Sequence, residues 1–302
     1  MPPTNSPTLR QRRLGAELRK LRERAGLTAT GAAELLGVNQ SRVSMIETGR
    51  TPISADRLRS MAHVYDCSDE ALIDALAAMT GRRARGWWEG YREHLPAALV
   101  DLAELEHYAT GLRVTLALRI PALLQTTDHA RALFQAVVPS MRQYEIEHRL
   151  THRIKRQGIL HREQPPRYAA IIHESALRMR FGGPDVRRGR LQHLLDMSEL
   201  PHVSVRVIPF DTESYPSTGQ SFDYVEGQVP QLDTVQLDTQ PQYDDGRPHP
   251  RFLDLGGLPS VRGASRLLGR FALTVAGIGS HGRSPNASRR GEDQSGQPEG
   301  RL

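Results

Sequence analysis

The sequence predicts two domains, a bundle of five short α-helices followed by a larger α+β domain with a small sheet. The chain of 302 residues is long enough for two ordinary domains, and its 38% hydrophobic and 25% charged residues are typical of a globular protein with a normal core. Through residues 9–80, apolar residues recur at helical spacings between glycines and capping residues. Alternating apolar runs typical of strands begin only near Tyr168.

Composition excludes several classes of function. The single cysteine, Cys67, rules out intrachain disulfides and zinc sites built on several cysteines. Residues 1–7 carry no apolar leader, and no run approaches the roughly 18 apolar residues of a membrane span, so we expect a cytoplasmic protein. The net charge is +6, and residues 9–60 hold eleven Arg or Lys against five Asp or Glu. This positive N-terminal segment favours a polyanionic partner.

Leucine spacing predicts the first two helices. One face of the first helix holds Leu14, Leu18 and Leu21. The opposite face is rich in arginine and lysine, and we expect the helix to stop at Gly26. Thr28 is placed to cap a short second helix, which Gly37 then ends in a left-handed conformation.

The segment from Gln40 to Thr48 predicts a third helix, with Val43 and Ile46 facing the core. Its outward side chains are Gln40, Ser41, Arg42, Ser44 and Met45. A fourth helix begins near Ser54, and Asp69 is placed to cap a fifth. Periodicity and charge alone fit equally well a helical bundle that has no nucleic-acid role.

Residue identities separate these alternatives. The informative residues are Leu18, Leu21, Arg22, Gly26, Leu27, Thr28, Ala33 to Val38, Val43, Ser44, Ile46, Glu47, Gly49, Arg50 and Pro52. In this order and spacing they resemble the Xre-type helix-turn-helix regulators. The resemblance implies a lambda-repressor-like helix-turn-helix domain over residues 9–80, which binds double-stranded DNA sequence-specifically.

The resemblance also implies roles for single residues. The third helix of such a domain enters the major groove, which is about 12 Å wide. The implied base readers are Gln40, Ser41 and Ser44. Arg42 reads guanine or touches phosphate, and Met45 packs on a thymine methyl group or fills the core. The implied phosphate contacts are Thr28, Arg50 and Arg13.

The second helix departs from the family pattern. Ala29 and Gly31 stand where the family often has Gln and Glu, which removes a phosphate ligand and a capping box. We expect this helix to be less stable, because glycine inside a helix costs about 0.5 to 1 kcal/mol relative to alanine. We expect Glu47 to make a structural contact within the domain, because a free acid beside the groove would repel phosphate.

A basic stretch and the two tryptophans lead us to place a linker at residues 81–98 and a second domain at residues 99–242. Trp87 and Trp88 either stack on nucleic acid or anchor one domain against the next. The predicted helices of the second domain are residues 99–108, 126–137, 144–161, 174–179 and 186–198. The predicted strands are residues 168–172, residues 202–208 and two more near Phe222 and Val235.

The second domain resembles an uncharacterised domain of actinobacterial Xre-type regulators, the WhiJ-like group, through several short segments. They include Ile120, Pro121, Leu123 to Thr126, Ala130, Arg131, Arg149, Arg153, Arg156, Gln157, Leu160, Glu174, Gly182, Gly183, Leu191, Leu200, Pro201, Val207 to Pro209 and Phe222. Ala122 and His129 stand where the family usually has Gly and Tyr. The resemblance implies an antitoxin-like domain and a small partner protein encoded nearby, but no chemistry.

The sequence supports no catalytic or metal site. His148 and His152 lie four residues apart, but Arg149 and Arg153 crowd them with positive charge, so we expect no metal and no cofactor. Glu174 follows a predicted strand, where catalytic acids occur, yet a carboxylate that caps a short helix is the commoner explanation. Because no nucleophile-elbow, phosphate-loop or dinucleotide motif is present, we do not expect an enzyme.

The basic helix of the second domain is open to several interpretations. Its arginines are Arg149, Arg153, Arg156 and, just beyond it, Arg162. Three interpretations fit these arginines: they bind an acidic partner protein or an anionic ligand, they extend the DNA footprint, or they form an ordinary solvated face. The sequence does not separate these possibilities.

Beyond Tyr243 the family resemblance stops. Residues 243–302 are rich in Ser, Gly, Arg and Pro, a composition that resists folding, so we expect a largely disordered terminus. A reading-frame change in a GC-rich gene would produce such a segment.

Two functions remain in view. The first is a homodimeric transcriptional regulator, whose recognition helices lie about 34 Å apart and whose second domain binds a partner or effector. The second is an antitoxin-like protein that sequesters a small partner and uses DNA binding to regulate its own locus.

Overall fold

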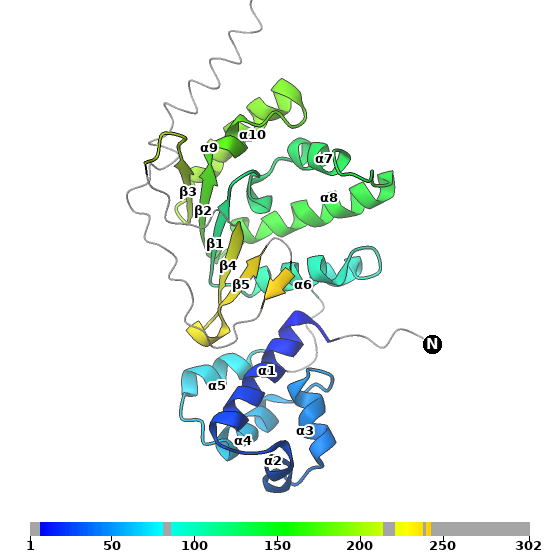
Figure 1. The fold of residues 1–302 in the computed structure, drawn as a ribbon, viewed down its shortest axis with the longest axis vertical. Helices are drawn as coiled ribbons and strands as arrows, with labels where there is room; N and C mark the ends of the chain where they lie inside the picture. The colour runs from blue at the N-terminus through cyan, green and yellow to red at the C-terminus, as the bar shows by residue number, and fades with distance from the viewer. Residues whose placement is uncertain (1–6, 81–85, 214–220, 238–239, 243–302) are drawn as a thin grey trace, which may run out of the picture.

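The computed structural model describes residues 7–80, 86–213, 221–237 and 240–242. Figure 1 shows two parts, a helical bundle at the bottom and a sheet with its helices above it. This arrangement confirms the predicted fold class, an all-α N-terminal bundle followed by an α+β domain. None of the helices in the described part is long and apolar enough to cross a membrane. The terminus discussed above, residues 243–302, lies outside the described residues.

Five helices form the N-terminal bundle, in the predicted order. They are α1 (Leu9–Arg24), α2 (Ala29–Leu35), α3 (Gln40–Glu47), α4 (Ala55–Val64) and α5 (Glu70–Ala77). The predicted caps at Thr28 and Asp69 are confirmed, and Ser54 caps α4, which begins where expected: each side chain accepts a hydrogen bond from the backbone amide of the third residue of its helix. Gly26 and Gly37 have φ angles of 70° and 62°, so they end the first two helices as expected.

The position of α3 is fixed by its close approach to α1. A Cβ atom at Gly15 in α1 would lie only 2.4 Å from the carbonyl oxygen of Glu47. A glycine is therefore required where the two backbones touch. Gly49, directly after α3, has a φ angle of 73°, and its Cβ atom would lie 2.7 Å from the backbone of Gln11. Both ends of this contact depend on the absence of a side chain.

The second part begins with a short 3-10 helix and alternates helices with strands. Its helices are η1 (Trp87–Tyr91), α6 (Ala97–His107), η2 (Ala122–Leu124), α7 (Thr127–Gln135), α8 (Gln143–Gln157), η3 (Gly158–His161), α9 (Glu174–Arg178), α10 (Gly183–Ser198) and η4 (Pro230–Leu232). Its strands are β1 (Gly111–Leu116), β2 (Arg167–His173), β3 (Val203–Ile208), β4 (Phe222–Glu226), β5 (Thr234–Leu237) and β6 (Gln240–Gln242).

The strands form one mixed sheet in the order β3-β2-β1-β4-β5-β6. The first three strands of the chain run parallel, and the last three pair antiparallel. The sequence analysis missed β1, which lies at the centre of the sheet, and β6. The apolar alternation of β1 is only three residues long, Leu112, Val114 and Leu116, and it starts at Gly111, a residue type depleted in strands.

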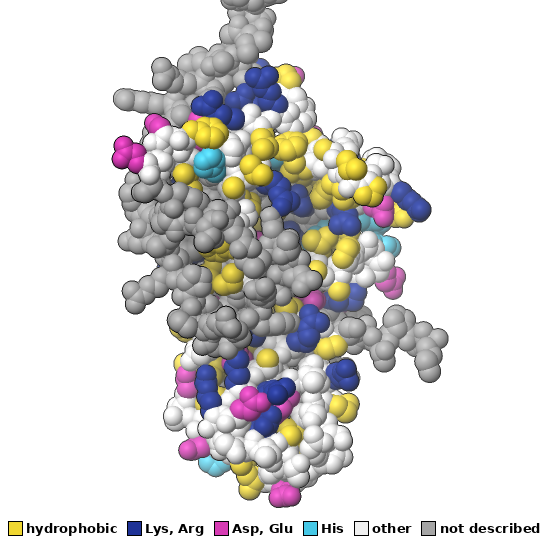
Figure 2. Space-filling view, in the orientation of Figure 1, with side chains coloured by type: hydrophobic (Ala, Val, Ile, Leu, Met, Phe, Trp, Pro, Cys, Tyr) yellow, Lys and Arg dark blue, Asp and Glu magenta, His cyan; other side chains and the backbone are white. Residues whose placement is uncertain are grey.

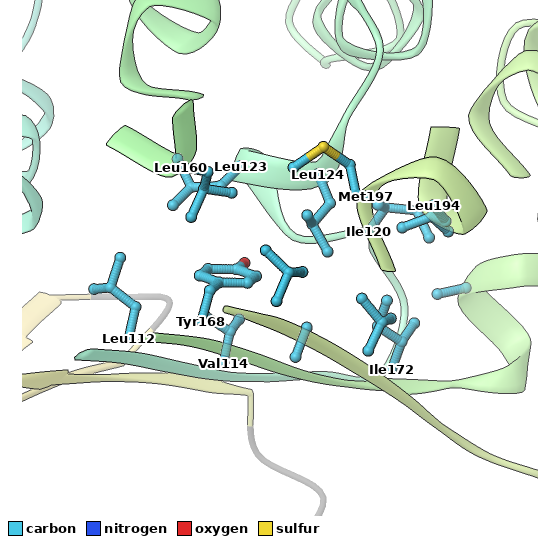
Figure 3. Close-up of a cluster of buried hydrophobic side chains, with 14 of the residues drawn as sticks. Leu112, Val114, Ile120, Leu123, Leu124, Leu160, Tyr168, Ile172, Leu194 and Met197 are labelled. Atoms are coloured by element: carbon cyan, nitrogen blue, oxygen red, sulfur yellow. The ribbon is translucent and has the colours of Figure 1, made fainter. Parts of the chain in front are cut away.

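The main core of the second part lies between one face of the sheet and the helices. Figure 3 shows Leu112, Val114, Tyr168 and Ile172 rising from the strands. They meet apolar side chains from η2, η3 and α10, namely Leu123, Leu124, Leu160, Leu194 and Met197. Parallel strands joined by helical crossovers bury their apolar face in this way.

The predicted helix of residues 144–161 is shorter than expected. Helix α8 ends at Gln157, and the chain continues from Gly158 as the 3-10 helix η3. A glycine at this point weakens the α-helix, because it adds backbone freedom and supplies no side chain for packing.

The two tryptophans pack within the protein. Trp88 is 1% exposed and forms a cluster with Tyr91, Leu95 and Val100. Its ring centroid lies 4.8 Å from that of His107 at the end of α6. A ring this deeply buried is not available to stack on nucleic acid, and its cluster partners all belong to the second part, so Trp88 packs within that part.

The bundle and the second part contact each other directly. The amide of Leu9 donates a hydrogen bond of 3.1 Å to the carboxylate of Asp101 in α6. The turn at η4, drawn in yellow between β4 and β5, reaches the bundle in Figure 1. There Gln231 donates a hydrogen bond of 2.9 Å to Asp69, and Leu232 packs against the bundle core. Helices α1 and α5 are thereby fixed to the sheet.

Candidate nucleic-acid interface

Helices α2 and α3 meet at a tight turn that exposes α3. Gly37 supplies the left-handed residue of the turn, and the amide of Val38 donates back to the carbonyl of Ala33 at 2.9 Å. Asn39 then caps α3, its side chain accepting a hydrogen bond of 2.8 Å from the amide of Arg42. This is the geometry of a helix-turn-helix unit, with a short first helix and a second helix on the surface.

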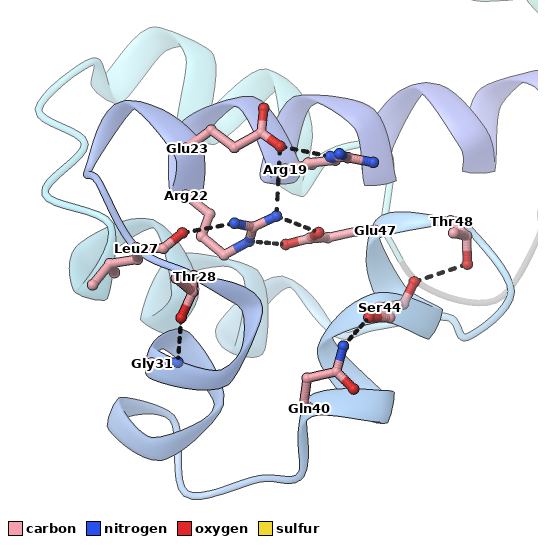
Figure 4. Close-up of polar contacts among 10 residues, drawn as sticks. All are labelled: Arg19, Arg22, Glu23, Leu27, Thr28, Gly31, Gln40, Ser44, Glu47 and Thr48. Atoms are coloured by element: carbon pink, nitrogen blue, oxygen red, sulfur yellow. Dashed lines mark hydrogen bonds and ion pairs between the residues drawn. The ribbon is translucent and has the colours of Figure 1, made fainter.

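The outward face of α3 is as the sequence predicts. Val43 and Ile46 are buried, whereas the side chains of Gln40, Ser41 and Arg42 are exposed. Figure 4 shows Gln40 beside Ser44, to whose hydroxyl its amide nitrogen donates a hydrogen bond of 2.9 Å. This bond ties the side-chain amide of Gln40, the first residue of α3, to Ser44 one turn later.

The exposure of Met45 decides between a core-filling role and a contact with a partner. Its side chain is 46% exposed, so it does not fill the core of the bundle. An exposed thioether beside polar residues offers an apolar contact to a partner.

Thr28 and Arg50 lie at the ends of the unit. Thr28 is exposed, and its hydroxyl accepts a hydrogen bond of 3.0 Å from the amide of Gly31 at the start of α2. No capping box accompanies this bond, as the sequence indicates. Arg50 lies just after α3; its side chain is exposed and has no hydrogen bond or ion pair with another described residue, while its backbone amide donates to the carbonyl of Met45 at 2.9 Å.

The structure places Arg13 elsewhere. Its side chain is buried, and its guanidinium donates to the carbonyl oxygens of Gln231 and Asp233 in the second part. It also pairs with Glu17 at 3.3 Å. Arg13 joins the two parts of the protein, and it is not exposed beside α3. The spacing of the first helix could not reveal this, because its partners lie more than 200 residues away in the chain.

Glu47 has the structural role that its position suggests. Its carboxylate accepts two hydrogen bonds from Arg22 in α1, at 2.6 and 2.9 Å, and both side chains are buried (Figure 4). The same guanidinium donates to the carbonyl of Leu27 at 2.7 Å, in the turn before α2. Hydrogen bonding to Glu47 raises the pKa of Arg22 above its ordinary value. The pair therefore holds α1, the turn and α3 together.

Six of the eleven Arg and Lys residues counted along residues 9–60 form ion pairs with carboxylates of described residues in the fold. In Figure 2, dark blue and magenta side chains lie together over α1, whereas the surface on the side of α3 is mostly neutral. Within α1, Arg19 pairs with Glu23 at 2.7 Å, and elsewhere in the bundle Arg59 pairs with Asp74 at 2.7 Å. Among the described residues of this segment, Arg10 and Arg57 donate to backbone carbonyls, and the arginine side chains with neither an ion pair nor a hydrogen bond are Arg24, Arg42 and Arg50. The sequence analysis did not single out Arg24, which ends α1.

The arginines of α8 are mostly engaged inside the second part. Arg156 is buried and forms two hydrogen bonds with Glu106, at 2.5 and 2.7 Å. Arg153 donates to Gln125 at 2.9 Å, and Arg149 is half-buried. Arg162 donates to backbone carbonyls, including that of His107 at 2.7 Å. They do not form one solvated face.

The candidate metal ligands His148 and His152 and the candidate acid Glu174 pack against other side chains of the second part. His152 is buried between the rings of Trp87 and Tyr91, while His148 stacks on His94 with ring centroids 4.3 Å apart. Glu174 is buried, accepts a hydrogen bond of 2.9 Å from the amide of Phe210 and pairs with an arginine one turn later. Within the described ranges, no three His, Cys, Asp or Glu side chains are grouped closely enough to hold a metal ion.

Comparison with protein families matches both parts of the chain. Residues 13–76 match a helix-turn-helix domain, and residues 99–243 match a domain of unknown function, DUF5753. No curated protein and no solved structure gives a significant match. The helices α1 to α5 thus belong to a helix-turn-helix domain of the DNA-binding kind, which is followed by a domain of the DUF5753 type.

Proposed function

We propose that this protein is a sequence-specific transcriptional regulator of the Xre type, which inserts α3 into the major groove of DNA. The observation that carries the proposal is the exposed face of α3 in a helix-turn-helix domain. That face presents hydrogen-bonding groups and one apolar group, namely Gln40, Ser41, Arg42, Ser44 and Met45. The major groove distinguishes base pairs by a pattern of donors, acceptors and methyl groups, which side chains of these types can read.

Gln40 is the best-placed base reader. An amide side chain bonds adenine at N6 and N7 with both of its polar atoms, and its bond to Ser44 limits its rotation before binding. Arg42 reads guanine or contacts a phosphate nearby, and Met45 packs on a thymine methyl group. Thr28 and Arg50 contact phosphates on either side and fix the register of α3 without reading sequence.

We further propose that the protein binds as a homodimer. One recognition helix of this kind reads few base pairs, and related domains read two half-sites about 34 Å apart, one helical turn along the duplex. The DUF5753-type domain then receives a partner or an effector, and its contacts with α1 and α5 provide the physical connection to the DNA-binding domain.

Selection of bound fragments from a genomic DNA library tests the proposal. Purified protein is expected to enrich an inverted repeat, and a variant with both Gln40→Ala and Arg42→Ala is expected to lose that enrichment while remaining folded. Arg59→Ala is the matched control, since it also removes an exposed arginine but from α4, where it pairs with Asp74. Binding without sequence preference would contradict the proposal. A stable complex between the second domain and the product of a neighbouring small gene, without such enrichment, would instead support the antitoxin-like function.

A further inference from the structure

A cleft of about 450 Å³ opens over the β1, β4 and β5 half of the sheet in the second domain. Leu112 and Val114 from β1 and Val225 from β4 form its floor. Its walls come from α6, from residues 119–125 and from the end of α7, and α8 contributes the side chains of Arg153 and Arg156. Some of its lining residues, among them Leu112, Val114 and Tyr168, also belong to the main core, so the cleft borders that core directly.

The lining of the cleft is largely apolar. Leucine, valine, phenylalanine, isoleucine, proline and methionine side chains make up most of it. Figure 2 shows this part of the surface, around α7 and α8, as yellow side chains with a few dark blue ones among them. A volume of this size falls within the range of about 300 to 1,000 Å³ that is typical of small-molecule sites.

The charged side chains of the cleft carry one excess positive charge. Its charged residues are Arg119, Arg153, Arg156, Glu106 and Asp223. Arg156 is neutralised by its two hydrogen bonds to Glu106, and neither Arg119 nor Asp223 is without a partner. Arg153 donates only to the neutral oxygen of Gln125 and lies over the ring of Phe134, with no carboxylate within 4 Å among the described residues.

Two further observations concern polar groups of the cleft that are not fully compensated within the described residues, namely those of Arg153 and Tyr168. Burial, reinforced by the charges of Arg156 and Arg119, lowers the pKa of Arg153 to about 9, so its charged form lacks compensation. Tyr168 is also among the residues that line the cleft, and its buried hydroxyl has no hydrogen bond; the residue is only 2% exposed (Figure 3). Buried polar atoms of this kind are usually satisfied, so an unsatisfied one in a cleft is a candidate contact for a ligand.

We infer that this cleft binds a small monocarboxylic acid, whose apolar part fills the space over β1 and β4 and whose carboxylate pairs with Arg153. A single negative charge matches the single excess positive charge, and Glu106 and Asp223 disfavour a multiply charged anion such as a phosphate. The planar guanidinium suits a carboxylate, and Gln125, which is itself buried, holds it in position. The inference rests on the proposed function only in calling this acid an effector, because the binding itself does not require DNA.

Equilibrium dialysis of the full-length protein with decanoate tests this site, with decan-1-ol and inorganic phosphate as further probes. We expect one decanoate per chain, weaker binding of the alcohol, and no displacement of decanoate by phosphate. Arg153→Met is expected to weaken decanoate binding by about tenfold or more, the loss of one desolvated charge pair, and to change decanol binding little. Lys155→Met is the matched control, since it removes an exposed positive charge from the same helix outside the cleft.

A second variant keeps the test decisive if Arg153→Met does not fold. Ala122→Trp fills the cleft from a half-buried lining position without changing charge, so it should abolish decanoate binding. Absence of decanoate binding at about 1 mM, unchanged binding by both variants, or tighter binding of phosphate than of decanoate would each overturn the inference. Because these measurements contain no DNA, failure of the regulator proposal would leave their outcome unaffected.

Discussion

At the scale of single residues, the Arg22–Glu47 pair decides where α3 lies. The two residues are 25 positions apart in the chain and come from different helices, and both side chains are buried. Such a pair need not add net stability compared with apolar residues, but removing one partner leaves an uncompensated buried charge. Position-dependent DNA reading requires an orientation that is held firmly, and this pair provides it.

Glu47→Ala should therefore destabilise the helix-turn-helix domain by about 3 kcal/mol, because the buried charge of Arg22 would lose both hydrogen bonds to a buried carboxylate and keep, among carboxylates, only a 3.7 Å contact with the exposed Glu23. The midpoint of urea unfolding measures the change. Asp74→Ala is the control, since Asp74 makes an exposed pair with Arg59 away from Arg22 and its loss should cost less than about 1 kcal/mol. Equal shifts for the two variants would show that the Arg22–Glu47 pair does not hold the domain together.

Arg13 and Arg50 should differ in their effect on the salt dependence of DNA binding. Each phosphate contact contributes about 0.9 to the slope of log affinity against log salt concentration. Arg50→Gln should reduce the slope by about this amount, whereas Arg13→Gln should leave it unchanged, because Arg13 is buried against Gln231 and Asp233. A lower slope for Arg13→Gln would restore the phosphate role that the sequence resemblance suggests.

At the scale of elements, α2 is the least stable part of the helix-turn-helix unit. It has seven residues, no capping box and a glycine at position 31. The backbone of Gly31 is helical, and a Cβ atom there would meet only the hydroxyl of Thr28, at 3.4 Å. The glycine therefore has no steric necessity, in contrast to Gly15 in α1.

Gly31→Ala is expected to stabilise the domain by about 0.5 to 1 kcal/mol, because alanine loses less backbone entropy in a helix. Gly15→Ala should destabilise it, since its Cβ atom would lie 2.4 Å from the backbone of α3. Thermal unfolding of the two variants compares them directly. A lower melting temperature for Gly31→Ala would show that α2 needs the glycine for a reason other than propensity.

The contrast between these elements shows what a sequence can predict. The caps at Thr28, Ser54 and Asp69 follow from local chemistry, so the five helices and the outward face of α3 were predictable. The central strand β1 was not recognised, because its apolar pattern is short and its stability comes from pairing with β2 and β4. The partners of Arg13 and Arg153 depend on contacts between distant segments, which no local pattern contains.

At the scale of the whole molecule, buried histidines link stability to pH. Burial and the neighbouring arginines lower the pKa of His152 to about 3 and that of His129 to about 4, from an ordinary value near 6.5. Both rings are neutral in the fold. The unfolded chain binds more protons between these values and pH 6.5, so stability is complete above pH 6.5 and is lost as the pH falls.

Each histidine should lower the free energy of unfolding by up to about 1.4 kcal/mol per pH unit below pH 6.5. His152→Phe keeps an aromatic ring between Trp87 and Tyr91 and removes the titration, so the stability of this variant should fall less steeply. Urea unfolding measures the free energy of unfolding against pH for the wild type and for His152→Phe. The measurements are made at pH 7.5, 6.5, 5.5 and 4.5, which span about one unit above to two units below the ordinary histidine pKa. Parallel curves would contradict the low pKa of His152.

The account as a whole depends on α3 reading DNA bases. The most direct test measures the affinity of the intact protein and of Gln40→Ala for every single-base variant of the selected DNA site. We predict that Gln40→Ala loses a preference of about 1 to 3 kcal/mol at one base pair in each half-site and keeps the preferences elsewhere. Unchanged preferences at every position, in a variant that is still folded, would contradict the placement of α3 in the major groove.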